Sequence, residues 1–283
     1  MLEEPEALEL LLVRHAESVW NADNRWQGQT DVPLSARGTA EAALIAARLA
    51  REPLDAIVSS DLSRARETAE AIVSARRDAG LLGELAQHRG LREMDLGAWC
   101  GLPHTEVMSR FPDELEALAR GEDRPIGGHG ESLPAFEARV HAALGEVLAA
   151  RAGASRILVV THGGCIRALL MRLLSLHGRR RPLEGAGNTS LTTLRVARGQ
   201  VRALVSYNDA THLGAATRAH DGAEVSDDRT TLAGEAGRAR VLELLGLADA
   251  SVIEAAPGDA ATELAPAARR LIRYAVRPSV VRG

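Results

Sequence analysis

The sequence predicts an α/β fold in which helices cover a mostly parallel central sheet. Short apolar runs alternate with longer segments of helical periodicity through the first two-thirds of the 283-residue chain. A short, continuously apolar run is typical of a strand that is buried on both faces, as strands of parallel sheets are. Polar residues cluster directly after three of these runs, where the carboxyl ends of parallel strands would meet.

The expected elements largely alternate between strand and helix, which favours a sheet covered by helices. Ser35 is a suitable N-cap, because its hydroxyl oxygen can accept a hydrogen bond from a first-turn amide of the following helix. Two later apolar segments, on either side of Arg198 and Gly199, are expected to form a closing hairpin. In chain order, the expected elements are strand 8–13, helix 36–50, strand 55–59, helix 62–75, helix 134–150, strand 156–161, helix 163–174, strand 190–196 and strand 201–207.

The character of the chain changes after residue 213. Residues 214–229 are small, polar and acidic, which is typical of a linker. Two further helices are expected at residues 232–247 and 263–276, although this tail has few large apolar residues. We therefore predict one catalytic domain over residues 1–213 and a C-terminal extension of unknown role over residues 214–283.

Charge and composition limit the classes of partner. The net charge of −4 does not favour nucleic acid or an anionic membrane as a partner. An anionic ligand would therefore need a local cluster of positive charge. The sequence contains no lysine, so all 34 basic residues are arginine. Fixed cations at a site are then arginine or histidine, and Schiff-base chemistry is excluded.

Cysteine usage and the N-terminal segment predict a cytoplasmic protein. Cys100 and Cys165 have no metal-type spacing and do not form a disulfide framework, which fits a reducing compartment. The chain begins with acidic residues where a signal peptide would be basic, and its first apolar run is too short to span a bilayer.

The polar clusters after the three strands predict a phosphate site. Arg14 and His15 follow the first strand, Arg64 lies shortly after the second, and His162 follows the third. Planar guanidinium groups match phosphate oxygens and stay charged at any relevant pH. Asn21 adds a neutral donor. Gly163 and Gly164, at the start of a helix, are expected to let backbone N–H groups approach an anion.

A series of ordered motifs resembles those of the histidine phosphatase superfamily, which includes cofactor-dependent phosphoglycerate mutase. Residues 14–17, Arg-His-Ala-Glu, are similar to the Arg-His-Gly-Glu signature, with Ala16 in place of the usual glycine. The series spans roughly residues 8–213 and is far more specific than any one motif. The further similar segments are residues 25–35, 60–65, 91–99, 130–132, 161–164 and 187–190.

The resemblance implies a phosphoglycerate mutase-like, three-layer α/β/α sandwich and a phosphohistidine mechanism without metal or cofactor. His15 is then the nucleophile, and Glu93 protonates the leaving oxygen and later activates water. The residues expected to bind the transferring phosphoryl group are Arg14, Arg64 and His162. The residues expected to bind substrate are Asn21, Gln27, Gly28 and Gly163.

Some roles have alternatives at this point. Asp95 competes with Glu93 for the role of proton donor, and Asn21 is also suited to capping a turn. A metal-dependent hydrolase with His15, His162 and Glu93 as ligands is disfavoured, because two nearby arginines would repel a divalent ion. A non-catalytic module that binds phosphorylated ligands is the third class.

A phosphatase is favoured over a mutase. The 69 positions between Glu93 and His162 (162 − 93 = 69) are few for a mutase, and no Pro-Pro segment lies between them. The sequence resembles broad-specificity, α-ribazole and glucosyl-3-phosphoglycerate phosphatases, of which the last is the favoured specific prediction. The expected partner is a small phosphomonoester, and a homodimer is the default expectation for the family.

Overall fold

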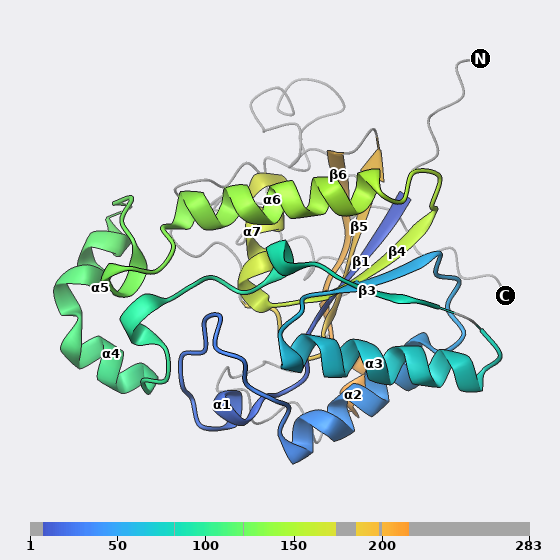
Figure 1. Cartoon of the computed structure of the whole chain (residues 1–283), viewed down its shortest axis with the longest axis horizontal. Coiled ribbons are helices and arrows are strands. Elements are labelled where there is room, and N and C mark those ends of the chain that lie inside the picture. Colours follow the sequence, from blue (N-terminus) through green and yellow to red (C-terminus); the bar gives the residue numbers. More distant parts are fainter. Residues whose placement is uncertain (1–7, 82, 121, 174–184, 198–199, 215–283) are drawn as a thin grey trace, which may run out of the picture.

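A six-stranded sheet forms the centre of the fold, with the strand order β3-β2-β4-β1-β5-β6 (Figure 1). The computed structural model describes residues 8–81, 83–120, 122–173, 185–197 and 200–214. β1 to β4 are mutually parallel, whereas β5 is antiparallel to both β1 and β6. The strands are β1 (Leu8–Arg14), β2 (Ala56–Ser59), β3 (Leu85–Gln87), β4 (Arg156–Thr161), β5 (Leu191–Ala197) and β6 (Gln200–Asp209). The prediction of a mostly parallel sheet is confirmed.

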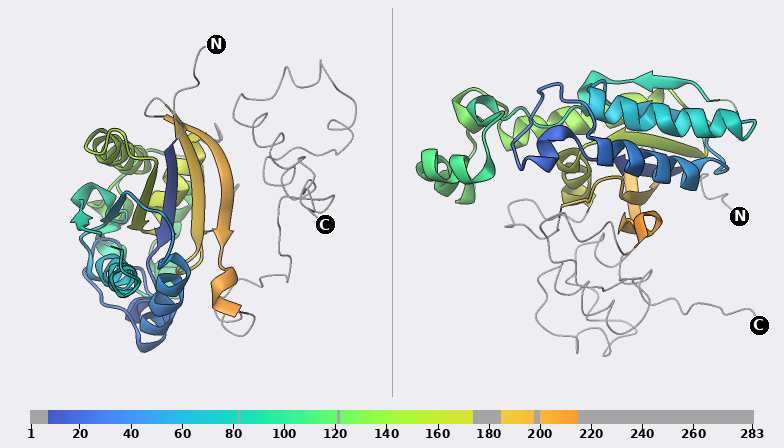
Figure 2. Two further views of the ribbon diagram at one scale, coloured as in Figure 1. Left: turned by 90° about the vertical axis from the view of Figure 1, so that its right-hand side faces the viewer. Right: turned by 90° about the horizontal axis from the view of Figure 1, so that it is seen from below.

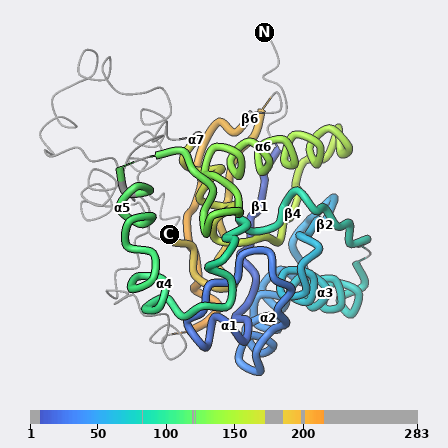
Figure 3. The backbone as a smooth tube through the Cα atoms, turned by 60° about the vertical axis from the view of Figure 1, so that its left-hand side comes forward, coloured from blue at the N-terminus to red at the C-terminus, as the bar shows by residue number. Residues whose placement is uncertain are grey.

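Helices lie on both faces of the sheet (Figures 1 and 2). α2 and α3 cover one face, and α6 and α7 cover the other. α4 and α5 follow one another to one side of the sheet (Figure 3). The helices are α1 (Val19–Ala22), α2 (Ala36–Leu49), α3 (Ser63–Asp78), α4 (His104–Arg110), α5 (Pro112–Ala119), α6 (Leu133–Ala149) and α7 (Gly163–Leu173). Short 3₁₀ helices are η1 (Arg89–Leu91), η2 (Gly97–Trp99), η3 (Ile126–Gly128) and η4 (Thr211–Leu213).

Alternate side chains of β1 enter two separate hydrophobic cores. Leu11 and Val13 belong to the core that includes residues of α2 and α3. Leu10 and Leu12 belong to the core that includes residues of α6 and α7. All four side chains are at most 1% exposed, which explains why this strand is a continuous apolar run rather than an alternating one. The three-layer architecture follows from burying both faces of the same strands.

The elements predicted up to residue 207 are confirmed, and the largest difference is that α3 ends at Asp78 rather than at residue 75. Ser35 is the N-cap of α2, and its side chain accepts a hydrogen bond from the Gly38 N–H at 2.9 Å. The structure adds α1, α4, α5 and β3, which are 4, 7, 8 and 3 residues long. Elements this short carry too little periodicity to be recognised from a pattern.

Two sets of predictions lie outside the described residues. These are the turn at residues 198–199 and the linker and helices expected beyond Gly214. Within the described part of the chain, none of the helices has the length and apolar character needed to cross a membrane.

Candidate active site

The carboxyl ends of β1, β2 and β4 bring the predicted site residues together. Arg14, the last residue of β1, is in parallel register with Thr161 of β4. The residues that follow the strands are also tied to β4, because the N–H groups of His15 and Ser60 each donate to a β4 carbonyl at 2.9 Å. The rings of His15 and His162 consequently lie 5.1 Å apart, measured between their centroids.

His15 is held as a neutral imidazole with one ring nitrogen already engaged. The side chain is buried, and its Nδ1 lies 2.7 Å from the carbonyl oxygen of Ala16. A ring nitrogen can contact a carbonyl oxygen only as a donor, so Nδ1 carries the proton and Nε2 keeps its lone pair. Burial, followed by the charges of Arg64 and Arg14, holds the pKa of His15 well below its ordinary value of 6.5. At neutral pH the ring is therefore uncharged, and the lone pair of Nε2 is not protonated.

A turn before β5 holds the backbone around His15. The side-chain amide of Asn188 donates to the His15 carbonyl at 2.9 Å, and the Thr189 N–H donates to the Arg14 carbonyl at 3.0 Å. Thr189 has a φ of 54°, a left-handed conformation that is rare for a β-branched residue. Sequence reasoning recognised this segment only as a family motif and assigned Asn188 no role.

Arg64 is a buried, preoriented cation. It is 1% exposed, and its two terminal nitrogens each donate at 2.9 Å, one to the Thr30 carbonyl and one to the Gly28 carbonyl. Burial lowers the pKa of Arg64 to about 10, so it remains charged at neutral pH. Its Nε is buried and has no hydrogen-bond partner among the described residues. The bonds to the two carbonyls use two of the five N–H donors of the guanidinium.

Gly28 orients Arg64 through its carbonyl. Its φ of 51° favours glycine, and a Cβ there would lie 2.8 Å from Cys100 Sγ. Direct contact between Gly28 and substrate stays a prediction.

Arg14 is oriented by the chain that leads into β5. Its Nη1 donates to the Ala186 carbonyl at 2.5 Å. Gly163 lies against the same side chain, since a Cβ at Gly163 would be 3.6 Å from both Cδ and Nε of Arg14. The predicted phosphate ligand Arg14 and the predicted substrate-binding Gly163 therefore occupy one corner of the site.

His162 is fully buried and is supported by Ser60. Its Nε2 lies 2.9 Å from Ser60 Oγ, and its Nδ1 has no partner in the described part of the chain. Burial, together with the charges of Arg64 and the other nearby cations, holds the pKa of His162 well below 6.5. Sequence reasoning gave Ser60 no individual role, although its position directly after β2 was the available signal.

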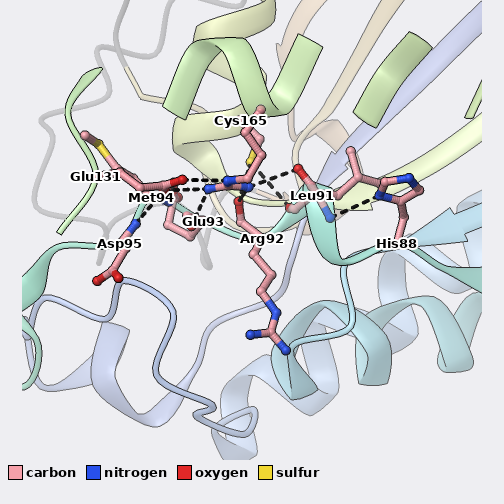
Figure 4. A network of polar contacts seen from close by, with 10 residues as sticks. His88, Leu91, Arg92, Glu93, Met94, Asp95, Glu131 and Cys165 are labelled. Atoms are coloured by element: carbon pink, nitrogen blue, oxygen red, sulfur yellow. Dashed lines mark hydrogen bonds and ion pairs between the residues drawn. The ribbon is translucent and has the colours of Figure 1, made fainter. Parts of the chain in front are cut away.

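Glu93 reaches the same site from the loop between η1 and η2. Its Oε1 accepts from the Met94 N–H at 2.8 Å, and its Oε2 accepts from the Gly164 N–H at 3.0 Å. The expectation that the Gly164 amide approaches an anionic ligand is therefore wrong, because that N–H donates to Glu93. Asp95, the competing candidate, instead accepts from the Gly97 N–H at 3.0 Å, and its carboxylate points away from Cys165 and the start of α7 (Figure 4).

Asn21 and Gln27 are joined through Ser18, in the loop that follows His15. Ser18 caps α1 in a reciprocal capping box with Asn21. The Ser18 hydroxyl also lies 2.7 Å from Gln27 Oε1. The structure thus shows Asn21 in the turn-capping role that was its alternative. Substrate contacts of Asn21 and Gln27 stay predictions.

No three histidine, cysteine or acidic side chains are grouped so as to hold a metal ion in the part of the chain that the structure describes. The groups that meet are instead those that suit an anion: two guanidinium groups and two neutral imidazoles. They form what we call the strand-end cluster, made up of Arg14, His15, Arg64 and His162. The Glu93 carboxylate lies close enough to this cluster to interact with the charge of Arg64, and it is bound to the first turn of α7 through the Gly164 N–H.

Comparisons with known proteins agree with this arrangement. The family model described as histidine phosphatase superfamily (branch 1) matches residues 10–210. Phosphoglycerate mutase-like protein 4 of Arabidopsis thaliana is 37% identical over 213 residues, which cover 75% of this chain and 89% of that protein. Phosphoserine phosphatase 1 of Hydrogenobacter thermophilus is 33% identical over 73% of this chain and 95% of its own length.

Among solved structures, a mycobacterial glucosyl-3-phosphoglycerate phosphatase is similar with a TM-score of 0.62 and 31% identity. The match covers 72% of this chain and all of that structure. The fold, the strand-end cluster and these matches agree. The chain is an enzyme of the histidine phosphatase superfamily and belongs to its branch 1.

Proposed function

We propose that this protein hydrolyses a small phosphomonoester in two steps through a phosphohistidine at His15. The observation that carries the proposal is the state of His15, a buried imidazole whose Nδ1 is bound to the Ala16 carbonyl, an arrangement that would leave the lone pair of Nε2 for attack on phosphorus. A neutral imidazole attacks phosphorus well, and one that is already oriented loses little entropy in doing so.

In the first step, Nε2 of His15 forms a bond to phosphorus as the bond to the leaving oxygen breaks. Charge is spread over the three remaining phosphoryl oxygens, where Arg14 and Arg64 supply fixed positive charge. We assign the Ser60 hydroxyl as the donor to Nε2 of His162, an assignment that puts the ring proton on Nδ1, the nitrogen with no partner among the described residues. In the proposed mechanism this N–H donates to a phosphoryl oxygen. Glu93, in its protonated form, gives its proton to the leaving alcohol.

In the second step, the Glu93 carboxylate takes a proton from water as that water attacks phosphorus. The bond between phosphorus and Nε2 breaks, inorganic phosphate leaves, and both His15 and Glu93 return to their starting states. The net reaction consumes one phosphomonoester and one water and releases an alcohol and phosphate.

Glucosyl-3-phosphoglycerate is the specific substrate we favour, with another sugar or organic phosphate as the broader class. Support comes from the mycobacterial phosphatase of that name, while a phosphoserine phosphatase among the relatives makes phosphoserine a second candidate. Mutase activity on phosphoglycerate is the alternative, and the short interval of 69 positions between Glu93 and His162 (162 − 93 = 69) argues against it. A homodimer and a cytoplasmic location stay predictions, the first testable by sedimentation equilibrium.

The decisive experiment measures phosphate release from p-nitrophenyl phosphate, with a chelator present and no added metal. Wild type is compared with His15→Ala and with His141→Ala, a control that removes a histidine of α6. We expect turnover in wild type and the control and none in His15→Ala. Samples quenched in alkaline detergent, which preserves the acid-labile P–N bond, should contain a phosphohistidine that is absent from His15→Ala. Full activity of His15→Ala would disprove the nucleophile assignment.

Substrate choice is tested separately on the same proteins. A panel of glucosyl-3-phosphoglycerate, phosphoserine, α-ribazole phosphate and 3-phosphoglycerate is ranked by kcat/KM. We expect glucosyl-3-phosphoglycerate to rank first. Conversion of 3-phosphoglycerate to its 2-isomer faster than release of phosphate would favour the mutase alternative. Binding of these ligands with no turnover would favour a non-catalytic module.

A further inference from the structure

The loop that carries Glu93, residues 90–95, is tied to α6 through the side chain of Arg139, and we call this segment the acid loop. Arg139 of α6 donates to the carbonyls of Gly90, Arg92 and Glu93 at 3.0, 2.9 and 3.1 Å. Its other two N–H groups donate to the Glu131 carboxylate at 2.6 and 2.7 Å. A guanidinium has five N–H donors, so all of them are used.

Glu131 extends this network to the far end of the acid loop. Its Oε2 also accepts from the Asp95 N–H at 2.9 Å, and its backbone N–H donates to the Asp95 carbonyl at 2.9 Å. Figure 4 shows Glu131 beside Asp95 and next to Glu93. The guanidinium of Arg139 also lies over the Phe136 ring, 5.2 Å from its centroid, which fixes the plane of the fork.

The distribution of these bonds distinguishes positioning of the loop from a simple ion pair. An arginine that only paired with Glu131 would use two of its donors in a bidentate contact. Here the other three bind carbonyls of the acid loop, and one of those carbonyls belongs to Glu93 itself. Cys165 also holds the loop, since its buried thiol contacts the carbonyls of Leu91 and Arg92 at 3.4 and 3.2 Å.

We propose that Arg139, aligned by Glu131, is a positioning residue that sets the place of the Glu93 carboxyl relative to the leaving oxygen. This inference rests on the proposed function, in which Glu93 is the proton donor. Arg139 has no part in binding the phosphoryl group, since all its donors are used within the protein. Its loss should therefore weaken proton donation and leave phosphoryl binding and nucleophilic attack largely intact.

Leaving-group dependence separates this role from general destabilisation. Phenyl phosphate and p-nitrophenyl phosphate have nearly the same shape, but phenolate is much the more basic leaving group and needs the proton more. The ratio of their kcat/KM values, measured on one preparation, does not depend on the fraction of folded enzyme. Because kcat/KM reports steps up to departure of the alcohol, the later role of Glu93 as a base does not enter.

The variants are Arg139→Met, Arg139→Lys, Glu131→Gln and Glu93→Gln, with Arg156→Met as the control. Arg156 is also a partly exposed, ion-paired arginine, bound to Glu9 and Glu52 at the amino end of β4. For Arg139→Met we expect kcat/KM to fall on the order of 10²-fold with phenyl phosphate, as for a misplaced catalytic group. With p-nitrophenyl phosphate the fall should be less than about threefold, because that leaving group needs little protonation.

By selectivity we mean a larger loss of kcat/KM with phenyl phosphate than with p-nitrophenyl phosphate. Arg139→Lys and Glu131→Gln should show a selectivity between those of wild type and Arg139→Met. Lysine has only three donors, and a side-chain amide in place of the Glu131 carboxylate cannot form the bidentate pair. If Arg139→Met does not fold, these two variants provide the test on their own. Equal losses on both substrates in the Arg139 and Glu131 variants would overturn the proposal, as would selectivity in Arg156→Met. If Glu93→Gln itself shows no selectivity, the proton-donor role in the proposed function fails as well, so the two failures are distinguishable.

Discussion

Replacing Gly164 by alanine should displace the Glu93 carboxyl, whose three atoms are the nearest neighbours of the new Cβ. A Cβ at Gly164 would lie 2.1 Å from Oε1, 3.0 Å from Cδ and 3.2 Å from Oε2 of Glu93. Ordinary contact begins near 3.4 Å, so the carboxyl has to move by about 1.3 Å (3.4 − 2.1 = 1.3). A displacement of roughly 1 Å in a catalytic group costs on the order of 10²-fold in rate.

The assay is kcat/KM with phenyl phosphate, where proton donation to the leaving oxygen matters most. Gly145 of α6 provides the control, because a Cβ there would meet no atom within 4 Å. Both changes replace a glycine of a helix by alanine. That replacement by itself stabilises a helix by roughly 0.5–1 kcal/mol. A thermal melt of each variant checks that the loss at Gly164 is not unfolding.

We expect a loss of about 100-fold in Gly164→Ala and wild-type activity in Gly145→Ala. The steric overlap is confined to Gly164. At the neighbouring Gly163, a Cβ would lie 3.6 Å from the Arg14 side chain, which is an ordinary contact. If Gly164→Ala keeps activity within about threefold of wild type on phenyl phosphate, then the position of the Glu93 carboxyl does not control proton donation, and the reasoning is refuted.

Three further outcomes are expected. Asn188→Ala leaves the buried carbonyl of His15 with only the 3.4 Å contact from the Thr189 N–H, so urea unfolding should show a loss of roughly 1 kcal/mol, and an unchanged midpoint would contradict this. Arg64→Lys removes the planar fork that binds the Gly28 carbonyl, and steady-state kinetics should show kcat lowered on the order of 10²-fold; lysine rescuing full activity would show that only charge matters. Burial lowers the pKa values of His15 and His162 in the folded state, so below about pH 6.5 the unfolded chain takes up protons that the native protein does not. The free energy of unfolding should therefore fall as pH drops from about 7 to about 5, with a flatter slope in His162→Gln; a slope identical to wild type would argue against the buried neutral state.

The residues of the candidate site differ in how far local pattern could identify them. His15 and His162 follow strands whose buried apolar runs are visible in the sequence, and parallel strands necessarily bring their carboxyl ends to one edge. The meeting of the two rings is therefore a consequence of topology that an α/β pattern already contains. Glu93 lies in a loop with no such pattern, and only its motif indicated it.

The supporting contacts were beyond the reach of local pattern. Arg139 lies 46 positions from Glu93, and on α6 it has the appearance of an ordinary solvated helix charge. The carbonyl of Ala186, which orients Arg14, is 172 positions away from it. Backbone carbonyls carry no side-chain identity, so no residue type marks them as ligands.

The sequence by itself determined the α/β class, the alternation of elements and the set of cations and histidines gathered at the strand ends. These depend on the periodicity of buried residues and on strand direction, and both can be inferred from short stretches of the sequence. Only the tertiary structure decided which carbonyls orient Arg14 and Arg64, that the Gly164 amide binds Glu93 rather than a ligand, and that Arg139 holds the acid loop. Such contacts depend on the paths of loops between elements, and these paths are set by packing of the whole chain rather than by any local pattern.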